Sequence, residues 1–104
     1  MSETVIGPTL TIDGEVSGDD ALSIHGVVRG TINVRDAVFV SADGRVEADI
    51  DSLDVEIAGA VEGNVAASEK IEIKSGGQLV GDVQAPRVLI ADGASFKGNI
   101  NMQG

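Results

Sequence analysis

Few residues of this 104-residue chain belong to types that perform chemistry, and their spacing is not that of a catalytic or metal site. The one histidine, His25, follows Ile24 in an alternating apolar stretch, where a strand would place it on the solvent side. A general base or a metal site would need partners at fixed spacing, and the chain has no second His and no Cys. We therefore interpret His25 as a solvated surface residue.

Carboxylates cluster in two short stretches, at residues 19–20 and at residues 49–54. Acidic side chains stacked on neighbouring coils could bind Ca²⁺. Calcium-binding β-helices repeat Gly-Gly-x-Gly-x-Asp, and only Gly76-Gly77 resembles that motif. The stretch from Gly26 to Gly30 is no phosphate loop, because no Lys-Ser/Thr follows it. The sequence predicts a solvated acidic face, with no metal, no cofactor and no catalytic residue.

The overall charge excludes some partners. The chain has 17 acidic and 7 basic side chains, a formal net charge of −10, and no basic stripe that would bind a nucleic acid backbone. No stretch approaches the roughly 18 to 20 apolar residues of a membrane-spanning helix. Residues 1–8 are no signal peptide, because they lack a basic region and a long apolar region. We therefore expect a non-enzymatic protein of the cytoplasm.

The secondary structure of the chain is predicted from its apolar residues. They alternate with a period of two, which is typical of half-buried β-strands. Six pairs show it: Leu10/Ile12, Leu22/Ile24, Val38/Val40, Val55/Ile57, Ile71/Ile73 and Val88/Ile90. Their second members lie 12, 16, 17, 16 and 17 residues apart, which indicates an internal repeat. Each pair is followed by a turn and a further alternating stretch, with glycine or alanine at one position: Gly30, Ala48, Gly63, Gly81 and Gly98.

This repeat predicts an all-β, single-domain β-solenoid of about six coils over residues 9–102. Residues 1–8 would be a short tail and residues 103–104 the C-terminal end. Coils stacked at about 4.8 Å would make a rod of roughly 25–30 Å. A hexapeptide β-helix, as in many acyltransferases, is less favoured because 16 and 17 are not multiples of six. A β-sandwich is also less favoured, because its strands do not align on a fixed period.

The two ends of such a rod are the candidate functional surfaces. Each end exposes an unpaired strand edge, and no amphipathic helix that could cap an end is visible in the sequence. We predict that apolar residues at these ends form a polymerisation interface, as open edges favour end-to-end stacking. The interface residues would be Phe96, Ile100 and Met102 at one end and Leu10, Ile12 and Val16 at the other.

The two ends differ in charge. Residues 1–62 hold 13 acidic and 3 basic side chains, a net charge of −10, whereas residues 63–104 hold 4 of each. The first coil carries four carboxylates, which form a candidate electrostatic end: Asp13, Glu15, Asp19 and Asp20. Salt should therefore affect contacts at the N-terminal end more than at the C-terminal end.

The sequence resembles the bactofilins, the polymer-forming cytoskeletal proteins of bacteria. The resemblance covers nearly the whole chain and rests on two features. One is the repeated Ile/Val-x-Gly-x-Val-x-Gly-x-Ile/Val pattern, seen from Ile57 to Val65. The other is the closing stretch from Asp92 to Met102, which contains Phe96. Six coils with that ending distinguish the family better than any single coil does.

The resemblance implies a right-handed, roughly triangular β-helix that polymerises without nucleotide into non-polar filaments through both ends. Phe96 matches an aromatic that the family needs for assembly. Members position other proteins, including enzymes of the cell wall, motility proteins and factors of chromosome segregation. Many members carry a basic or apolar N-terminal membrane-targeting stretch. None of the eight residues before the predicted helix is basic, so the sequence does not predict membrane association.

Two classes of function stay open at this point. The first is a structural polymer that serves as a scaffold for cytosolic or membrane-associated proteins. The second is a non-polymerising β-solenoid, either a binding module or a small hexapeptide-type enzyme. Electron microscopy of the purified protein separates them, because only the first class forms filaments.

Overall fold

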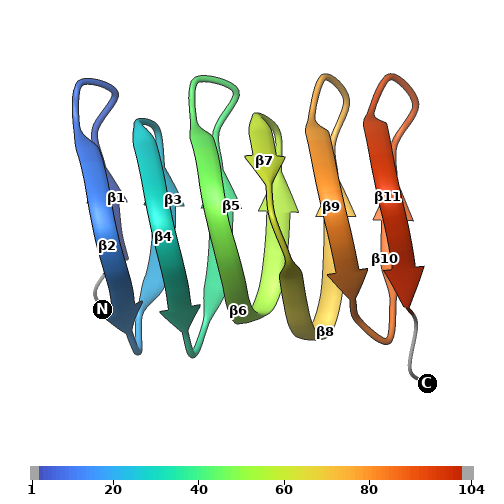
Figure 1. The fold of residues 1–104 in the computed structure, drawn as a ribbon, viewed down its shortest axis with the longest axis horizontal. Helices are drawn as coiled ribbons and strands as arrows, with labels where there is room; N and C mark the ends of the chain where they lie inside the picture. The colour runs from blue at the N-terminus through green and yellow to red at the C-terminus, as the bar shows by residue number, and fades with distance from the viewer. Residues whose placement is uncertain (1–2, 102–104) are drawn as a thin grey trace.

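The computed structural model describes residues 3–101, whose strands are all paired in parallel in one continuous β-solenoid (Figure 1). No helix occurs in this range. The strands are β1 (Glu3–Ile6), β2 (Thr11–Gly18), β3 (Ala21–Ile24), β4 (Val27–Val34), β5 (Ala37–Val40), β6 (Arg45–Ile57), β7 (Ala60–Glu62), β8 (Val65–Ile73), β9 (Gln78–Gln84), β10 (Val88–Ile90) and β11 (Ser95–Asn101).

The solenoid is a right-handed, triangular β-helix of about six coils. In Figure 1 the chain advances from left to right while the nearer strands run downward and the strands behind run upward, which is the right-handed sense. The molecule measures 31 × 25 × 24 Å, with its longest axis along the helix. The fold class expected from the sequence is therefore confirmed, and the length of the rod is close to the expected one.

Two faces of the triangle carry most of the strands. The first face consists of β1, β3, β5, residues 54–57 of β6, residues 70–73 of β8, and β10. The second face consists of β2, β4, residues 45–51 of β6, β7, residues 65–66 of β8, β9 and β11. Neighbouring strands on each face come from successive coils, so each coil pairs with the coil before and the coil after it.

The core is a set of vertical ladders of aliphatic side chains. One ladder on the first face stacks Ile24, Val40, Ile57 and Ile73, and each of these side chains is 0% exposed. β-branched side chains suit this stacking because their stiff χ1 angle costs little entropy to fix on a pleated surface. Full burial stabilises each one by about 1.5–3 kcal/mol. The alternation predicted from the sequence is thus confirmed in the core.

The expected start of the solenoid is wrong in two respects. Residues 3–6 are not tail, because they form β1 and pair with β3, Ile6 lying beside Ile24. Ile12 is not the equivalent of Ile24, because it pairs with Val28 on the second face. A period of two cannot distinguish the two faces of a coil. The interval of only 12 residues between Ile12 and Ile24 arises because the two residues lie on different faces. Residues 102–104, including Met102, lie outside the described residues.

The repeated glycine marks a bend within the second face. At Gly81 the backbone has φ +133°, and a Cβ atom there would collide with the carbonyl oxygen of Gly63 one coil below. Both the left-handed backbone and the close approach of the coils therefore require glycine at this position. Ala48 takes the equivalent place beside Gly30 and is 5% exposed, as the aligned repeat predicts.

Candidate assembly surfaces at the two ends of the rod

The C-terminal end of the rod is an open strand edge with apolar side chains at its inner side. β11 pairs with β9, and no strand of residues 3–101 pairs with its other edge. Phe96 lies beside Leu79 and Ile100 beside Val83, and both partners are only 1% exposed. Phe96 is partly buried and packs against the core, while Ile100 is 41% exposed. The last side chain of each ladder is thus covered by the preceding coil on one side, and no coil of residues 3–101 covers its other side.

The same edge contains a residue that the sequence analysis aligned but did not assign to the interface. Ile90 in β10 lies beside Ile73, yet Ile90 is 46% exposed whereas Ile73 is 0% exposed. The neighbouring Leu89 is 45% exposed. A simple signal could have found Ile90, because it is the last member of a ladder that the repeat already defined. The exposed apolar residues at the C-terminal edge therefore include Ile90 and Leu89 in addition to those expected from the sequence.

The N-terminal end is the corresponding edge of the first coil. Ile12 and Val16 in β2 lie beside Val28 and Ile32, both 0% exposed, and are themselves partly buried against the core. Leu10 precedes β2 in a turn and is 52% exposed. The structure thus places Ile12 and Val16 at the open edge of a strand. Leu10 lies in the adjoining turn rather than in the strand itself.

The four carboxylates of the first coil are all exposed. Asp13 and Glu15 alternate with the inward residues of β2, and Asp19 and Asp20 occupy the bend that follows. The basic side chains near these carboxylates are poorly positioned to neutralise their charge. The Asp19 Oδ1 atom lies 3.9 Å from Arg35 Nε with both side chains more than 80% exposed. Arg29, beside Asp13 in the register, donates to Glu47 Oε2 at 3.0 Å.

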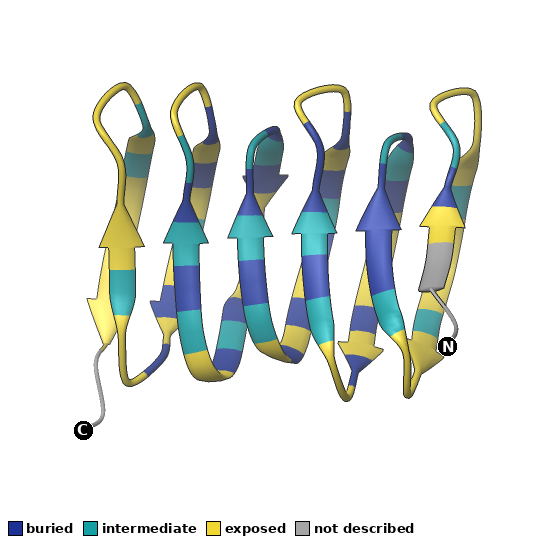
Figure 2. Ribbon diagram, turned by 180° about the vertical axis from the view of Figure 1, so that it is seen from behind, coloured by how far each residue is buried: buried dark blue, intermediate teal, exposed yellow. Residues whose placement is uncertain are grey.

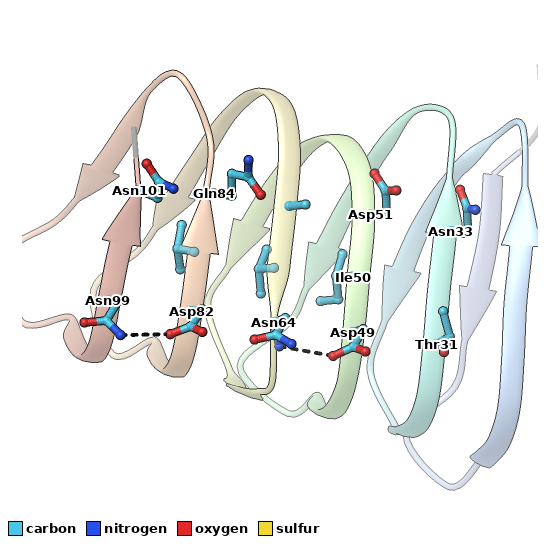
Figure 3. Close-up of a pocket in the computed structure, with 13 residues that line it drawn as sticks. Thr31, Asn33, Asp49, Ile50, Asp51, Asn64, Asp82, Gln84, Asn99 and Asn101 are labelled. Atoms are coloured by element: carbon cyan, nitrogen blue, oxygen red, sulfur yellow. Dashed lines mark hydrogen bonds between the residues drawn. The ribbon is translucent and has the colours of Figure 1, made fainter. Parts of the chain in front are cut away.

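An open groove of about 630 Å³ runs along the second face, with Ile50, Val65, Ala66 and Val83 among its apolar lining residues (Figure 3). Its polar lining residues, which come from successive coils, are mostly carboxylates and amides and include no His, Lys or Arg: Thr31, Asn33, Asp49, Asp51, Asn64, Asp82, Gln84, Asn99 and Asn101. The Asn99 side-chain amide donates to Asp82 Oδ1 at 3.2 Å, and the Asn64 backbone N–H donates to Asp49 Oδ1 at 3.3 Å. These bonds tie adjacent coils together.

The other candidate catalytic or metal-binding residues from the sequence are not surrounded by the partners that such a site needs. His25 follows β3, where its backbone N–H donates to the Ile6 carbonyl at 2.8 Å, and its side chain is partly exposed. Within residues 3–101, no group of three His, Cys, Asp or Glu side chains is placed to hold a metal ion. No helix long and apolar enough to cross a bilayer occurs in that range. The open strand edges are therefore the features that the structure singles out.

The geometry agrees with comparisons to known proteins. The bactofilin family profile, described as polymer-forming cytoskeletal, matches residues 4–101. Bactofilin BacO of Myxococcus xanthus (strain DK1622) is 55% identical over 102 residues, which cover 98% of this chain and 81% of that protein. Bactofilin BacP of the same organism is 38% identical over 102 residues, which cover 98% of this chain and 42% of that protein.

Two solved structures share the fold. The bactofilin of Thermus thermophilus, reconstructed as double helical filaments, superposes with a TM-score of 0.91 at 28% identity, over 96% of this chain and 99% of that one. The cytoskeletal bactofilin BacA, determined by solid-state NMR, gives a TM-score of 0.88 at 27% identity, over 98% of this chain and 97% of that one. Sequence, fold and open edges agree, and the chain belongs to the bactofilin family of polymer-forming cytoskeletal proteins.

Proposed function

We propose that this chain polymerises end to end, without a nucleotide, into non-polar filaments in the cytoplasm. The observation that carries the proposal is the pair of open apolar strand edges, with Ile12 and Val16 at one end and Phe96 and Ile100 at the other. Joining these edges buries apolar surface and pairs free backbone groups in the same step. The Thermus relative, which forms double helical filaments, supports both the filament and the pairing of filaments for this chain.

We further propose that the filament acts as a scaffold rather than as an enzyme. The family is cytoskeletal, and the lining of the groove on the second face includes no His, Cys, Ser or Lys. A polymer presents the same side-chain pattern once per subunit, so that a weak binding site becomes an array. Such an array suits the positioning of other proteins in cell-wall morphogenesis, motility or chromosome segregation.

Negative-stain electron microscopy of the purified chain tests the polymer directly. We expect filaments in buffer without nucleotide, and the same amount of pelleted protein after ultracentrifugation whether or not ATP or GTP is added. A monodisperse monomer at high protein concentration would show that the chain is instead a non-assembling solenoid.

The acidic first coil predicts that elongation depends on salt. In a non-polar filament like ends meet, so one junction brings together two copies of Asp13, Glu15, Asp19 and Asp20. Their repulsion is screened over about 10 Å at 0.1 M salt. At low salt and low concentration we expect dimers joined through the C-terminal ends, and added salt should drive elongation. Light scattering against ionic strength measures this.

Two neutralised variants separate the acidic end from the general charge of the rod. The end variant, Asp13→Asn, Glu15→Gln, Asp19→Asn and Asp20→Asn, should elongate at low salt and respond weakly to added salt. The matched control removes four exposed charges between the ends: Asp43→Asn, Asp51→Asn, Glu62→Gln and Glu69→Gln. The control should keep the wild-type salt response. Equal behaviour of the two variants would contradict a specific role of the N-terminal junction.

A further inference from the structure

The groove along the second face lies between two rows of outward side chains that run parallel to the axis of the rod (Figure 3). Each of five successive coils contributes one residue to each row. We term them the Asp49 row (Thr31, Asp49, Asn64, Asp82 and Asn99) and the Asp51 row (Asn33, Asp51, Ala66, Gln84 and Asn101). Since the rows are two strand residues apart, roughly 7 Å separates them, and five coils extend over roughly 19 Å. The groove is therefore long and narrow. From the side of the first face, seen in Figure 2, the strands that carry it lie behind.

Three exposed carboxylates in the groove are not neutralised by the protein. Asp49, Asp51 and Asp82 form no ion pair with a basic side chain of residues 3–101, where the ion pairs involve other acids. Asp49 Oδ1 accepts from the Asn64 backbone N–H and Asp82 Oδ1 from the Asn99 side-chain amide. These bonds hold two of the carboxylates in place and leave the second oxygen of each able to accept from a ligand.

The charges on either side of the groove balance, so that the negative charge is concentrated along it. On one side, the adjacent outward positions of the second to sixth coils hold two acidic and two basic side chains: Arg29, Glu47, Glu62 and Lys97. On the other side, the bends that follow the Asp51 row hold two of each: Arg35, Asp36, Glu69 and Arg87. Glu15 continues the Asp49 row into the first coil and adds to its acidity. A cationic ligand is therefore attracted to the groove itself.

The amides between the carboxylates suit a polypeptide better than a single cation. The side chains of Asn64, Gln84 and Asn99 can both donate and accept, which matches the N–H and C=O groups along an extended chain. The groove also has a side opening at Ala66, where a second hollow of about 410 Å³ shares Asp51, Ala66 and Gln84 with it. A long side chain of a bound peptide can enter there beside Asp51.

We propose that this groove binds an extended, basic segment of a partner polypeptide, whose Lys or Arg side chains meet the three carboxylates. The inference rests on the scaffold function proposed above, because it names the chemistry of a client that the scaffold would hold. Asp49 and Asp82 lie two coils apart, which is roughly 10 Å. A polyproline II segment rises about 3.1 Å per residue and repeats every three residues, so that residues three apart lie on one side at roughly 9 Å. Basic residues at every third position should therefore fit the groove.

Fluorescence anisotropy with a labelled ten-residue peptide tests the spacing. The probe carries lysine at every third position in a background of alanine and proline. The control peptide has the same composition, with its lysines consecutive. We expect the spaced probe to bind the wild-type protein more tightly than the control peptide, although both have the same charge. Equal binding of the two peptides would contradict the match between the groove and its ligand.

Two neutralised variants test the site. The groove variant is Asp49→Asn, Asp51→Asn and Asp82→Asn, in which asparagine keeps the shape and one acceptor oxygen of each side chain. We expect it to bind the spaced probe about tenfold more weakly, since three exposed ion pairs are lost. The matched control removes the same charge from two turns and the first face and should keep the wild-type affinity: Asp43→Asn, Glu56→Gln and Asp92→Asn.

The remaining outcomes overturn the proposal or separate it from the polymer. Equal weakening by both variants would indicate a general attraction to an acidic rod. Displacement of the probe by an equimolar amount of calcium chloride would make the groove a cation site. Far-UV circular dichroism checks folding, and if the groove variant fails to fold, Asp51→Asn alone makes the same test. Filaments that do not bind the probe would contradict the groove site alone, whereas a folded wild type that binds the probe without forming filaments would contradict only the polymer.

Discussion

Replacing Phe96 by arginine is expected to yield a folded protein that no longer forms filaments. Phe96 packs on Leu79 from below, while no coil within the described residues covers it from above. A guanidinium at this place would be desolvated in an apolar junction, at a cost of several kcal/mol. A loss of about 3 kcal/mol would raise the critical concentration for assembly about a hundredfold. Folding should survive because the inner coils retain their ladders.

Sedimentation beside far-UV circular dichroism measures both parts of this expectation. The mutant should give the β-rich spectrum of the wild type and remain in the supernatant. Phe96→Leu is the matched control, since it keeps an apolar side chain at the junction and should still pellet. A β-rich Phe96→Arg protein that pellets as the wild type does would remove Phe96 from the assembly surface.

Ile57→Asp should have the opposite effect and unfold the protein rather than release it as monomers. Ile57 is 0% exposed and lies between Val40 and Ile73 in the middle of the rod. Losing a buried Ile side chain costs about 2–5 kcal/mol, and an unpaired buried carboxylate adds a further cost of several kcal/mol. The sum of these two costs is comparable to the free energy of unfolding of a typical domain, ~5–15 kcal/mol.

The control for this variant is Leu53→Asp in the same strand, β6, where the side chain is 38% exposed. Thermal unfolding followed by circular dichroism should show a transition near that of the wild type for Leu53→Asp and no cooperative transition for Ile57→Asp. A folded, soluble Ile57→Asp monomer would mean that the middle coil contributes much less to stability than its burial implies.

The repeat could be predicted from the sequence because a solenoid is built from local patterns. Val38 and Val40 alternate with outward residues, and the same alternation recurs in each later coil, so that the inward positions were identified before any coil was placed. The position of Phe96 at an open edge also followed, since it lies in the last unit of the repeat. These inferences need only the period of two and the order of the coils along the chain.

Other features depend on which coil stacks upon which, and only the tertiary structure decided them. Ile6 rather than Ile12 lies beside Ile24, which alternation alone could not show because it does not distinguish one face of a coil from the next. Ile90 is exposed although its ladder is buried, because exposure depends on whether a further coil covers it. The alternating apolar residues and the glycine rows of the sequence by themselves determined a β-solenoid of about six coils. Its right-handed sense and its first coil are properties of the stacked coils, because they arise from contacts between residues about 16 to 18 positions apart.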